Sequence, residues 1–231
     1  MNESTRRKVN LVFDQKPSFH HAFNTKFSLA YIKNKKVLDI GCWTGQFEQL
    51  ASKYTKNITG IDPGIEAIKT AKKLVPKASF RVGNALNLDF KENSFDTVTI
   101  LDVLEHIPKN TEDICIKEIK KILKPNGYLI ISTPHAHPIS TFLDPAYYLI
   151  GHRHYTENKL RNLLTSNDFK VIKVKKTGGI YRILTTLIEY FFKHILKIKF
   201  NTPKWLENKI KSEYKSKNAF AQINIIARNN Y

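Results

Sequence analysis

The sequence predicts an α/β fold, in which helices cover both faces of a doubly wound sheet of parallel strands. Three observations predict it. Short β-branched runs alternate with amphipathic helical segments over residues 36–134. A glycine loop, with Gly41 and Gly45, follows the first of these runs. An acidic residue, Asp62, ends the second run, 21 residues beyond Gly41.

The first strand and the loop after it lie at the centre of the predicted fold. Val37 and Leu38 form an apolar run, Asp39 follows, and the chain passes through the two glycines into a segment with helical spacing. Glycine adopts backbone conformations that other residues avoid, and it lets a ligand approach the main chain closely. A strand, a glycine loop and a helix in this order are typical of nucleotide binding, although dinucleotide dehydrogenases share a related pattern.

The other elements are predicted from periodicity and from turn residues. Alternation and Asn, Gly or Pro at the ends of runs predict strands at 58–61, 79–82, 98–100, 128–132, 170–174 and 222–227. Helical spacing predicts helices at about 21–32, 64–74, 156–165 and 180–200. A further helix is expected after Thr111, which is a suitable N-cap residue.

Several motifs resemble the class I S-adenosylmethionine-dependent methyltransferases of the small-molecule type. Asp39-Ile40-Gly41-Cys42-Trp43-Thr44-Gly45 is similar to the first motif of that family, with Trp43 in place of the middle glycine. Further similarities are Gly83-Asn84-Ala85, Leu104-Glu105-His106 and Leu123-Lys124-Pro125-Asn126-Gly127. The resemblance implies a Rossmann-like sheet of seven strands, mostly parallel, with the last strand antiparallel.

The resemblance also implies a cofactor, S-adenosyl-L-methionine, and the residues that bind it. Asp62 would accept hydrogen bonds from the two ribose hydroxyls, and Asn84 would accept one from the adenine amino group. Trp43 departs from the family pattern, and this favours a non-catalytic cofactor-binding regulator as one alternative. The expected cofactor-binding residues are Asp39, Gly41, Trp43, Gly45, Asp62, Pro63, Asn84, Ala85 and Leu101.

Five histidines are candidates for a catalytic base. An oxygen acceptor must lose a proton, and histidine can take it near neutral pH. His106 follows the fourth strand, and the pairs His135/His137 and His152/His154 flank a loop after the fifth. Any of the five could be the base, and each could equally be a structural hydrogen-bonding group. We predict no metal site, because neither pair has a carboxylate at a recognisable spacing and methyl transfer needs no metal.

Composition favours one globular domain in a reducing compartment. The chain has 231 residues, 42% of them hydrophobic, and its two cysteines form no disulfide or zinc pattern. The N-terminal residues lack the apolar core of a secretory signal, so we expect a cytoplasmic protein. We divide the chain into an N-terminal helical cap, 1–35, and a methyltransferase domain, 36–231, with a basic amphipathic helical insertion at 177–220.

Basic charge is concentrated in residues 170–220, which include that insertion. This segment carries 13 Lys or Arg and three Glu, so it holds +10 of the net charge of +18. The helix expected at 180–200 has a broad apolar side and a charged side. Such a helix is typical of docking to an anionic membrane surface, but it could instead cover the substrate pocket, form a homodimer or bind RNA.

These observations predict an enzyme that methylates a hydroxylated small-molecule, glycan or lipid-linked acceptor by in-line transfer to oxygen. The fourth strand is not followed by Asn/Asp-Pro-Pro-Tyr/Phe, the signature of enzymes that methylate base amines. Nucleic acid is therefore not the expected partner, and an RNA methyltransferase remains an alternative because of the basic C-terminal region. If the amphipathic helix docks, the protein would lie at the inner face of the membrane.

Overall fold

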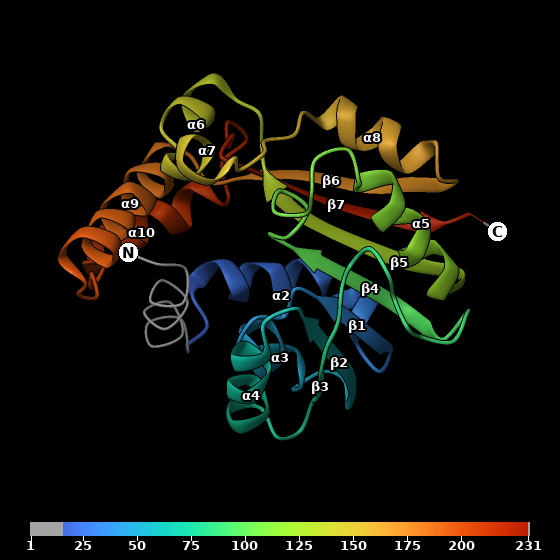
Figure 1. Ribbon diagram of the computed structural model, residues 1–231. Coiled ribbons are helices and arrows are strands. Elements are labelled where there is room, and N and C mark those ends of the chain that lie inside the picture. Colours follow the sequence, from blue (N-terminus) through green and yellow to red (C-terminus); the bar gives the residue numbers. More distant parts are fainter. Residues whose placement is uncertain (1–15, 231) are drawn as a thin grey trace.

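The computed structural model describes residues 16–230, which form a seven-stranded sheet in the order β3-β2-β1-β4-β5-β7-β6 (Figure 1). The strands are β1 (Lys36–Ile40), β2 (Asn57–Asp62), β3 (Ser79–Val82), β4 (Phe95–Leu101), β5 (Leu123–Pro134), β6 (Phe169–Thr177) and β7 (Gln222–Asn229). Strands β1 to β5 pair in parallel, whereas β7 runs antiparallel between β5 and β6. The predicted fold class, including its antiparallel last strand, is confirmed.

Helices cover both faces of this sheet (Figure 1). On one face, α5 (Glu112–Ile122) and α8 (Glu157–Thr165) pack in the largest apolar cluster, which includes Leu38 of β1. On the other face, α2 (Phe19–Ile32) and α3 (Gln46–Ala51) pack around Val37, while α4 (Ile65–Leu74) lies beside β2 and β3. Successive side chains of a strand point to opposite faces, so the adjacent Val37 and Leu38 of β1 are buried in different clusters, one on each face.

The strand order reverses at β1. This strand has β2 on one side and β4 on the other, and the chain continues outward from each of them. In open α/β sheets, ligands bind outside the carboxyl ends of the strands at such a switch point. The carboxyl ends of β1, β2 and β4 lead into Gly41, Asp62 and Asp102 respectively, so these residues border the expected site.

The segment between β6 and β7 contains α9 (Ile180–Phe191), the π-helix η1 (Phe192–Leu196) and α10 (Lys204–Glu213). The prediction of one helix over 180–200 is wrong beyond Phe191. The backbone widens into a π-helix there, and Lys197, with φ 58°, ends it. The rings of Phe192 and Phe200 then pack with their centroids 5.0 Å apart, which holds the returning chain against η1.

Glu213 of α10 caps the first turn of α9. Its carboxylate accepts hydrogen bonds from the backbone N–H groups of Gly179 (3.0 Å), Tyr181 (2.8 Å) and Arg182 (3.0 Å). The first N–H groups of a helix have no partner inside the helix, and a negative charge also complements the positive end of the helix dipole. The two helices therefore form one unit. Among residues 16–230, no helix is long and apolar enough to cross a membrane.

The N-terminal helix α2 packs against this unit. Phe23 of α2 contacts the apolar cluster of Leu206, Ile210 and Tyr214 on and just after α10. The predicted N-terminal cap lies in part, at residues 1–15, outside the described residues. The described part extends along the sheet and reaches the site through His20.

One predicted capping interaction is corrected. Thr111 is the N-cap residue of α5, but its hydroxyl donates to the Pro108 carbonyl (2.6 Å) instead of accepting a hydrogen bond from the helix. The short helices α6 (Pro138–Phe142) and α7 (Pro145–Ile150) follow β5. They lie near α9, away from β1, β2 and β3 (Figure 1).

Candidate active site

The glycine loop between β1 and α3 is held by Asp62. Gly41, Trp43 and Gly45 all have left-handed backbones, with φ of 79°, 49° and 82°. The carboxylate of Asp62 accepts hydrogen bonds from the N–H of Trp43 (3.2 Å) and from that of Gly64 (2.8 Å). Asp62 therefore joins the loop after β1 to the turn after β2.

Trp43, which replaces a glycine of the family pattern, has a left-handed backbone. It adopts the conformation that glycine adopts without cost, at a penalty of about 1–2 kcal/mol. Gly41 is less replaceable, because a Cβ on it would lie 2.1 Å from Cγ2 of Val103. The departure from the family pattern thus adds strain to the loop at this position.

The other expected cofactor-binding residues lie along the same edge of the sheet. Pro63 and Asn84 are exposed just beyond β2 and β3. The Asn84 side-chain oxygen accepts the N–H of Leu86 (3.0 Å), so one of its two acceptor positions is used in the turn. Ala85 packs against the main core and Leu101, at the end of β4, against the cluster around Val37.

Two carboxyl groups are buried beneath the loop. Asp39 accepts a hydrogen bond from the Thr99 hydroxyl, and Glu48 of α3 is completely buried. Burial raises the pKa of Asp39 to about 7, and burial together with the nearby Asp39 raises the pKa of Glu48 well above its usual value. This pair therefore holds a proton near neutral pH.

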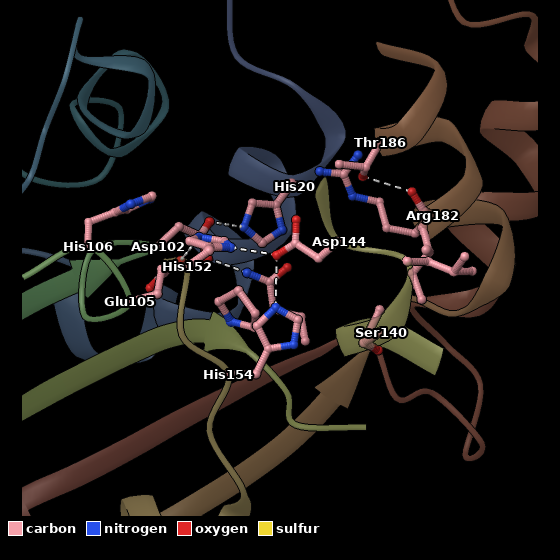
Figure 2. A pocket seen from close by; sticks show the side chains of 15 residues that line it. His20, Asp102, Glu105, His106, Ser140, Asp144, His152, His154, Arg182 and Thr186 are labelled. Carbon is pink, nitrogen blue, oxygen red and sulfur yellow. Dashed lines mark hydrogen bonds and ion pairs between the residues drawn. The ribbon is translucent and has the colours of Figure 1, made fainter. Parts of the chain in front are cut away.

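A cavity of about 290 Å³ lies beyond the ends of β4 and β5, where it is lined by α6, the segment before α7, α9 and the start of β7 (Figure 2). Polar side chains from distant parts of the sequence converge on it. Its lining residues are His20, Asp102, Glu105, His106, Pro134, Ser140, Leu143, Asp144, His152, His154, Arg182, Ile183, Thr186, Ala221 and Gln222. Of the five predicted histidines, the cavity brings together His106, His152 and His154.

The predicted pair His135 and His137 faces elsewhere. The Nδ1 of the buried His135 bonds to the Phe220 carbonyl (3.1 Å), and the His137 ring packs on the Phe220 ring with the centroids 4.2 Å apart. Neither residue lines the described cavity. Both contacts hold the chain just before β7.

Asp144 and Glu105 are carboxylate partners of the cavity histidines that the sequence did not lead us to expect. The Oδ2 atom of Asp144 lies 2.6 Å from Nδ1 of His152 and 2.8 Å from Nε2 of His154. Glu105 lies on the other side of His152, with 3.6 Å between Oε1 and Nε2. The expectation that the histidines have no carboxylate partner is therefore wrong. The turn through α7 returns the chain so that Asp144 meets residues eight and ten positions later.

These contacts shift the pKa values of the histidines in opposite directions. Burial opposes a charge on His152, but its hydrogen bonds to Asp144 and Glu105 outweigh this effect and raise its pKa to about 9. Burial similarly opposes the charge on Asp144, but the two histidines hold its pKa well below the usual value. At His106, desolvation lowers the pKa, the charge of Glu105 opposes this effect, and the nearby His152 adds to it.

The sequence analysis also did not single out His20 and Asp102. Nε2 of His20 lies 2.6 Å from Oδ2 of Asp102, and Nδ1 lies 3.0 Å from the Tyr214 hydroxyl. Asp102 also accepts hydrogen bonds from Ser132 (3.1 Å) and from Gln222. Burial alone would raise the pKa of Asp102, but His20 outweighs it and lowers the pKa to about 2. Asp102 could have been identified from the sequence because it directly follows β4. No local sequence pattern identifies His20.

Comparison with known proteins agrees with this geometry. Residues 38–131 match a family described as a methyltransferase domain. The 2-methyl-6-phytyl-1,4-hydroquinone methyltransferase of Synechocystis is 34% identical over 100 residues, 42% of this chain and 31% of that protein. A ubiquinone biosynthesis O-methyltransferase of Actinobacillus pleuropneumoniae is 33% identical over 108 residues, 43% of this chain and 45% of that protein. The chain thus spans less than half the length of these relatives.

A solved structure shares the fold over most of the chain. It is that of an S-adenosylmethionine-dependent methyltransferase from Methanosarcina mazei, with a TM-score of 0.62 and 23% identity over 87% of this chain and 95% of that chain. The chain therefore shares the fold of class I methyltransferases, and residues 38–131 match the methyltransferase domain family, as the sequence motifs indicated. The cofactor that this family implies is S-adenosyl-L-methionine.

The loop has the position expected for this cofactor. It follows β1 at the switch point of the sheet, where a nucleoside binds in this fold, and its left-handed residues include Gly41 and Gly45. Asp62, at the end of the neighbouring strand β2, contacts the backbone of both Trp43 and Gly64. Its carboxylate therefore lies at the edge of the sheet where the family places the ribose.

Replacing Asp62 by Ala should weaken S-adenosylmethionine binding by about 1.5–3 kcal/mol, because hydrogen bonds to a charged acceptor are lost. Isothermal titration calorimetry with the cofactor and with its demethylated product measures this. Asp89→Ala, which removes an exposed carboxylate after β3, is the control and should bind as the unaltered protein does. Binding of NAD instead of S-adenosylmethionine by the unaltered protein would contradict the assignment.

The Trp43 backbone conformation can be tested with two variants. Both Trp43→Ala and Trp43→Gly remove the indole, but only glycine removes the cost of the left-handed backbone. We expect Trp43→Gly to be more stable than Trp43→Ala by about 1 kcal/mol in urea unfolding. Equal stability of the two variants would mean that the loop is not left-handed at this position in solution.

The buried carboxyl pair should make stability depend on pH. A carboxyl group whose folded pKa is raised stabilises the fold below its unfolded pKa, and this contribution is lost as the pH rises through about 7 for Asp39. Glu48→Gln removes the second acid, so we expect a smaller fall in the free energy of unfolding between pH 5 and pH 8, by about 1 kcal/mol or more. Urea unfolding across this range, with the exposed Glu66→Gln as control, measures it. Parallel pH curves for Glu48→Gln and the unaltered protein would refute the prediction.

Proposed function

We propose that this protein methylates a hydroxyl oxygen of a lipid-linked or lipophilic small-molecule acceptor, with His106 as the general base. The cavity beyond the end of β4 carries the proposal. It is lined by histidines and carboxylates, and they include Asp102, which follows β4 at the carboxyl edge of the sheet, where ligands bind in open α/β sheets. The names of two relatives, a phytylhydroquinone methyltransferase and a ubiquinone biosynthesis O-methyltransferase, support an acceptor of this kind.

The reaction needs alignment and one proton acceptor. Bound S-adenosylmethionine supplies an electrophilic methyl group on a sulfonium. The acceptor oxygen would form a bond to the methyl carbon while the carbon–sulfur bond breaks. The electron pair of the carbon–sulfur bond would stay on sulfur. The hydroxyl proton passes to the base. The loop and the cavity hold the two reactants in line, and well-oriented reactants can gain about 7–11 kcal/mol from such alignment.

His106 is favoured as the base because, among the histidines of the cavity, its ring is the one that no hydrogen bond within the described residues occupies. His154 uses Nδ1 for the Thr141 hydroxyl and Nε2 for Asp144, and His152 lies between two carboxylates. Within residues 16–230, no hydrogen bond engages the ring of His106. Its ring lies at the cavity, 4.7 Å from that of His152 between centroids, so a nitrogen can reach an acceptor there.

His106→Gln should lower kcat by about 10²–10⁴-fold with little change in cofactor affinity, since general-base catalysis contributes about this much. The demethylated cofactor formed with a hydroquinone acceptor is the readout. His137→Gln, outside the cavity, should keep the activity. Full activity of His106→Gln would reject this base. Failure of all hydroxylated lipids and glycans, with salt-sensitive methylation of RNA, would favour the RNA alternative.

The orientation of α9 supports a membrane-surface location for the acceptor. Arg182, Ile183 and Thr186 of this helix line the cavity, and Ile183 is buried there. The other apolar residues face outward, where Leu184, Ile188 and Phe191 are 43%, 37% and 49% exposed. A helix that only covers a pocket would turn its apolar side inward. This arrangement leaves an outward apolar face that a membrane interface can cover.

Charge and neighbouring residues favour the same surface. Ile195, Leu196 and Ile198 extend the exposed apolar residues beyond α9, and Lys197 and Lys199 lie among them. An apolar face and basic residues together suffice for reversible binding to anionic lipid, where either signal alone is marginal. We therefore infer that the protein binds at the membrane surface, where a lipophilic acceptor can reach the cavity.

Leu184→Glu combined with Phe191→Glu should abolish co-sedimentation with vesicles that contain anionic phospholipid, because two charges would enter the apolar face. The matched control is Ile114→Glu with Ile172→Glu, two residues of similar exposure on α5 and β6, and it should sediment as the unaltered protein does. Equal recovery of the unaltered protein and the α9 variant in the supernatant, with both folded, would leave α9 as a lid or dimer element.

A further inference from the structure

We propose that Asp144, His152 and His154 form a binding site for a divalent transition-metal ion in the wall of the cavity. Asp144 Oδ2 lies within 2.6 Å of His152 Nδ1 and 2.8 Å of His154 Nε2, and the three potential ligand atoms lie within 4.8 Å of one another. Two imidazole nitrogens and one carboxylate oxygen are the donors of many zinc and iron sites that keep an open position.

The fold presents the two histidines on one side of an extended segment. Residues two apart in such a segment point the same way, so His152 and His154 both face Asp144 (Figure 2). Arg153, between them, faces the opposite way and donates to the carbonyls of Leu104 (2.7 Å) and Ile107 (2.6 Å). These hydrogen bonds fix the segment, so the two imidazoles are held without help from a ligand.

Each potential ligand has a second partner that orients it. Nδ1 of His154 lies 3.0 Å from the Thr141 hydroxyl, and Nε2 of His152 faces Glu105 at 3.6 Å. Oδ1 of Asp144 accepts the N–H of Ala146 (2.9 Å), which leaves Oδ2 for an ion. Metal-binding histidines usually donate their other ring N–H to a carboxylate or another acceptor, and such outer partners set the ligand geometry.

Charge also favours a cation at this position. The side chains of Asp144 and Glu105 are only 16% and 1% exposed, so their two negative charges are largely removed from water. Buried charges need compensation by an opposite charge or a metal. A protonated His152 supplies it in the absence of metal, and a bound divalent ion would take its place and release that proton. Ligands of a tetrahedral zinc ion lie about 3.3 Å apart, so a shift of about 0.5 Å would admit the ion.

This inference departs from the expectation of no metal, which rested on the missing carboxylate partner. It is independent of the proposed methylation, because metal binding can be measured without turnover. Where both hold, the ion would sit in the wall of the acceptor cavity and could polarise an acceptor oxygen. Metal binding without methylation would therefore reject only the proposed methylation. Methylation without metal binding would reject only the metal site.

The test uses tag-free protein that has been treated with a chelator and then titrated with ZnCl₂ by calorimetry. We expect about one equivalent of Zn²⁺ to bind, and added Co²⁺ to give ligand-field bands in the visible spectrum. Asp144→Asn and His154→Gln should each weaken Zn²⁺ binding by about 100-fold or more, and Thr141→Val, which removes only an outer partner, by about 10-fold. His137→Gln, outside the cavity, should bind Zn²⁺ as the unaltered protein does.

Binding of the demethylated cofactor shows whether each variant is folded, because the cofactor site lies on the other side of Asp102. No stoichiometric Zn²⁺ or Co²⁺ binding by the unaltered protein would overturn the proposal and leave an ion-pair network in its place. Equal loss of binding in His137→Gln and His154→Gln would also overturn it, since the ion would then be bound elsewhere. Thr141→Val keeps all three ligands, so its result stands even if Asp144→Asn does not fold.

Discussion

The hydrogen bonds that the glycine loop donates to the end of β2 are the constraint on which the cofactor side of the molecule depends. Gly41 and Cys42 donate to the Ile61 carbonyl, and the neighbouring Asp62 carboxylate accepts the N–H of Trp43, the left-handed residue in the middle of the loop. The parallel pairing of β1 and β2 puts the end of one strand beside the other, so the loop and the carboxylate meet. Trp43 can replace a glycine there because the backbone, rather than the side chain, makes this contact.

A second junction, at Asp102, joins the acceptor side. The N-terminal helix reaches it through His20, β5 through Ser132 and β7 through Gln222. The residue itself has a left-handed backbone, with φ 58°. Three segments far apart in the sequence thus depend on one carboxylate for their relative positions. The wall of the cavity is therefore a property of the whole chain, whereas the glycine loop is built from two adjacent strand–helix units.

This difference explains what the sequence could predict. The strands, the glycine loop and Asp62 follow local rules of spacing and periodicity, and the fold they predicted is confirmed. His106 was named as a candidate because it closely follows β4, and it lines the cavity. Asp144 and His20 were not, because their partners are decided by a turn of short helices and by the packing of α2 on α10, which no local pattern specifies. The helical wheel found the two sides of α9, but only the fold shows that the polar side faces inward.

The inward polar side of α9 has a further consequence for how molecules enter and leave. Arg182 and Thr186 border the cavity, while Leu184 and Ile188 on the same helix face outward. On that side, a single helix, about 10 Å across, thus separates the cavity from the exterior. The lipophilic acceptor proposed above would keep its tail along the outer side of this helix while its head group occupies the cavity. It would then not need to leave the protein completely between turnovers.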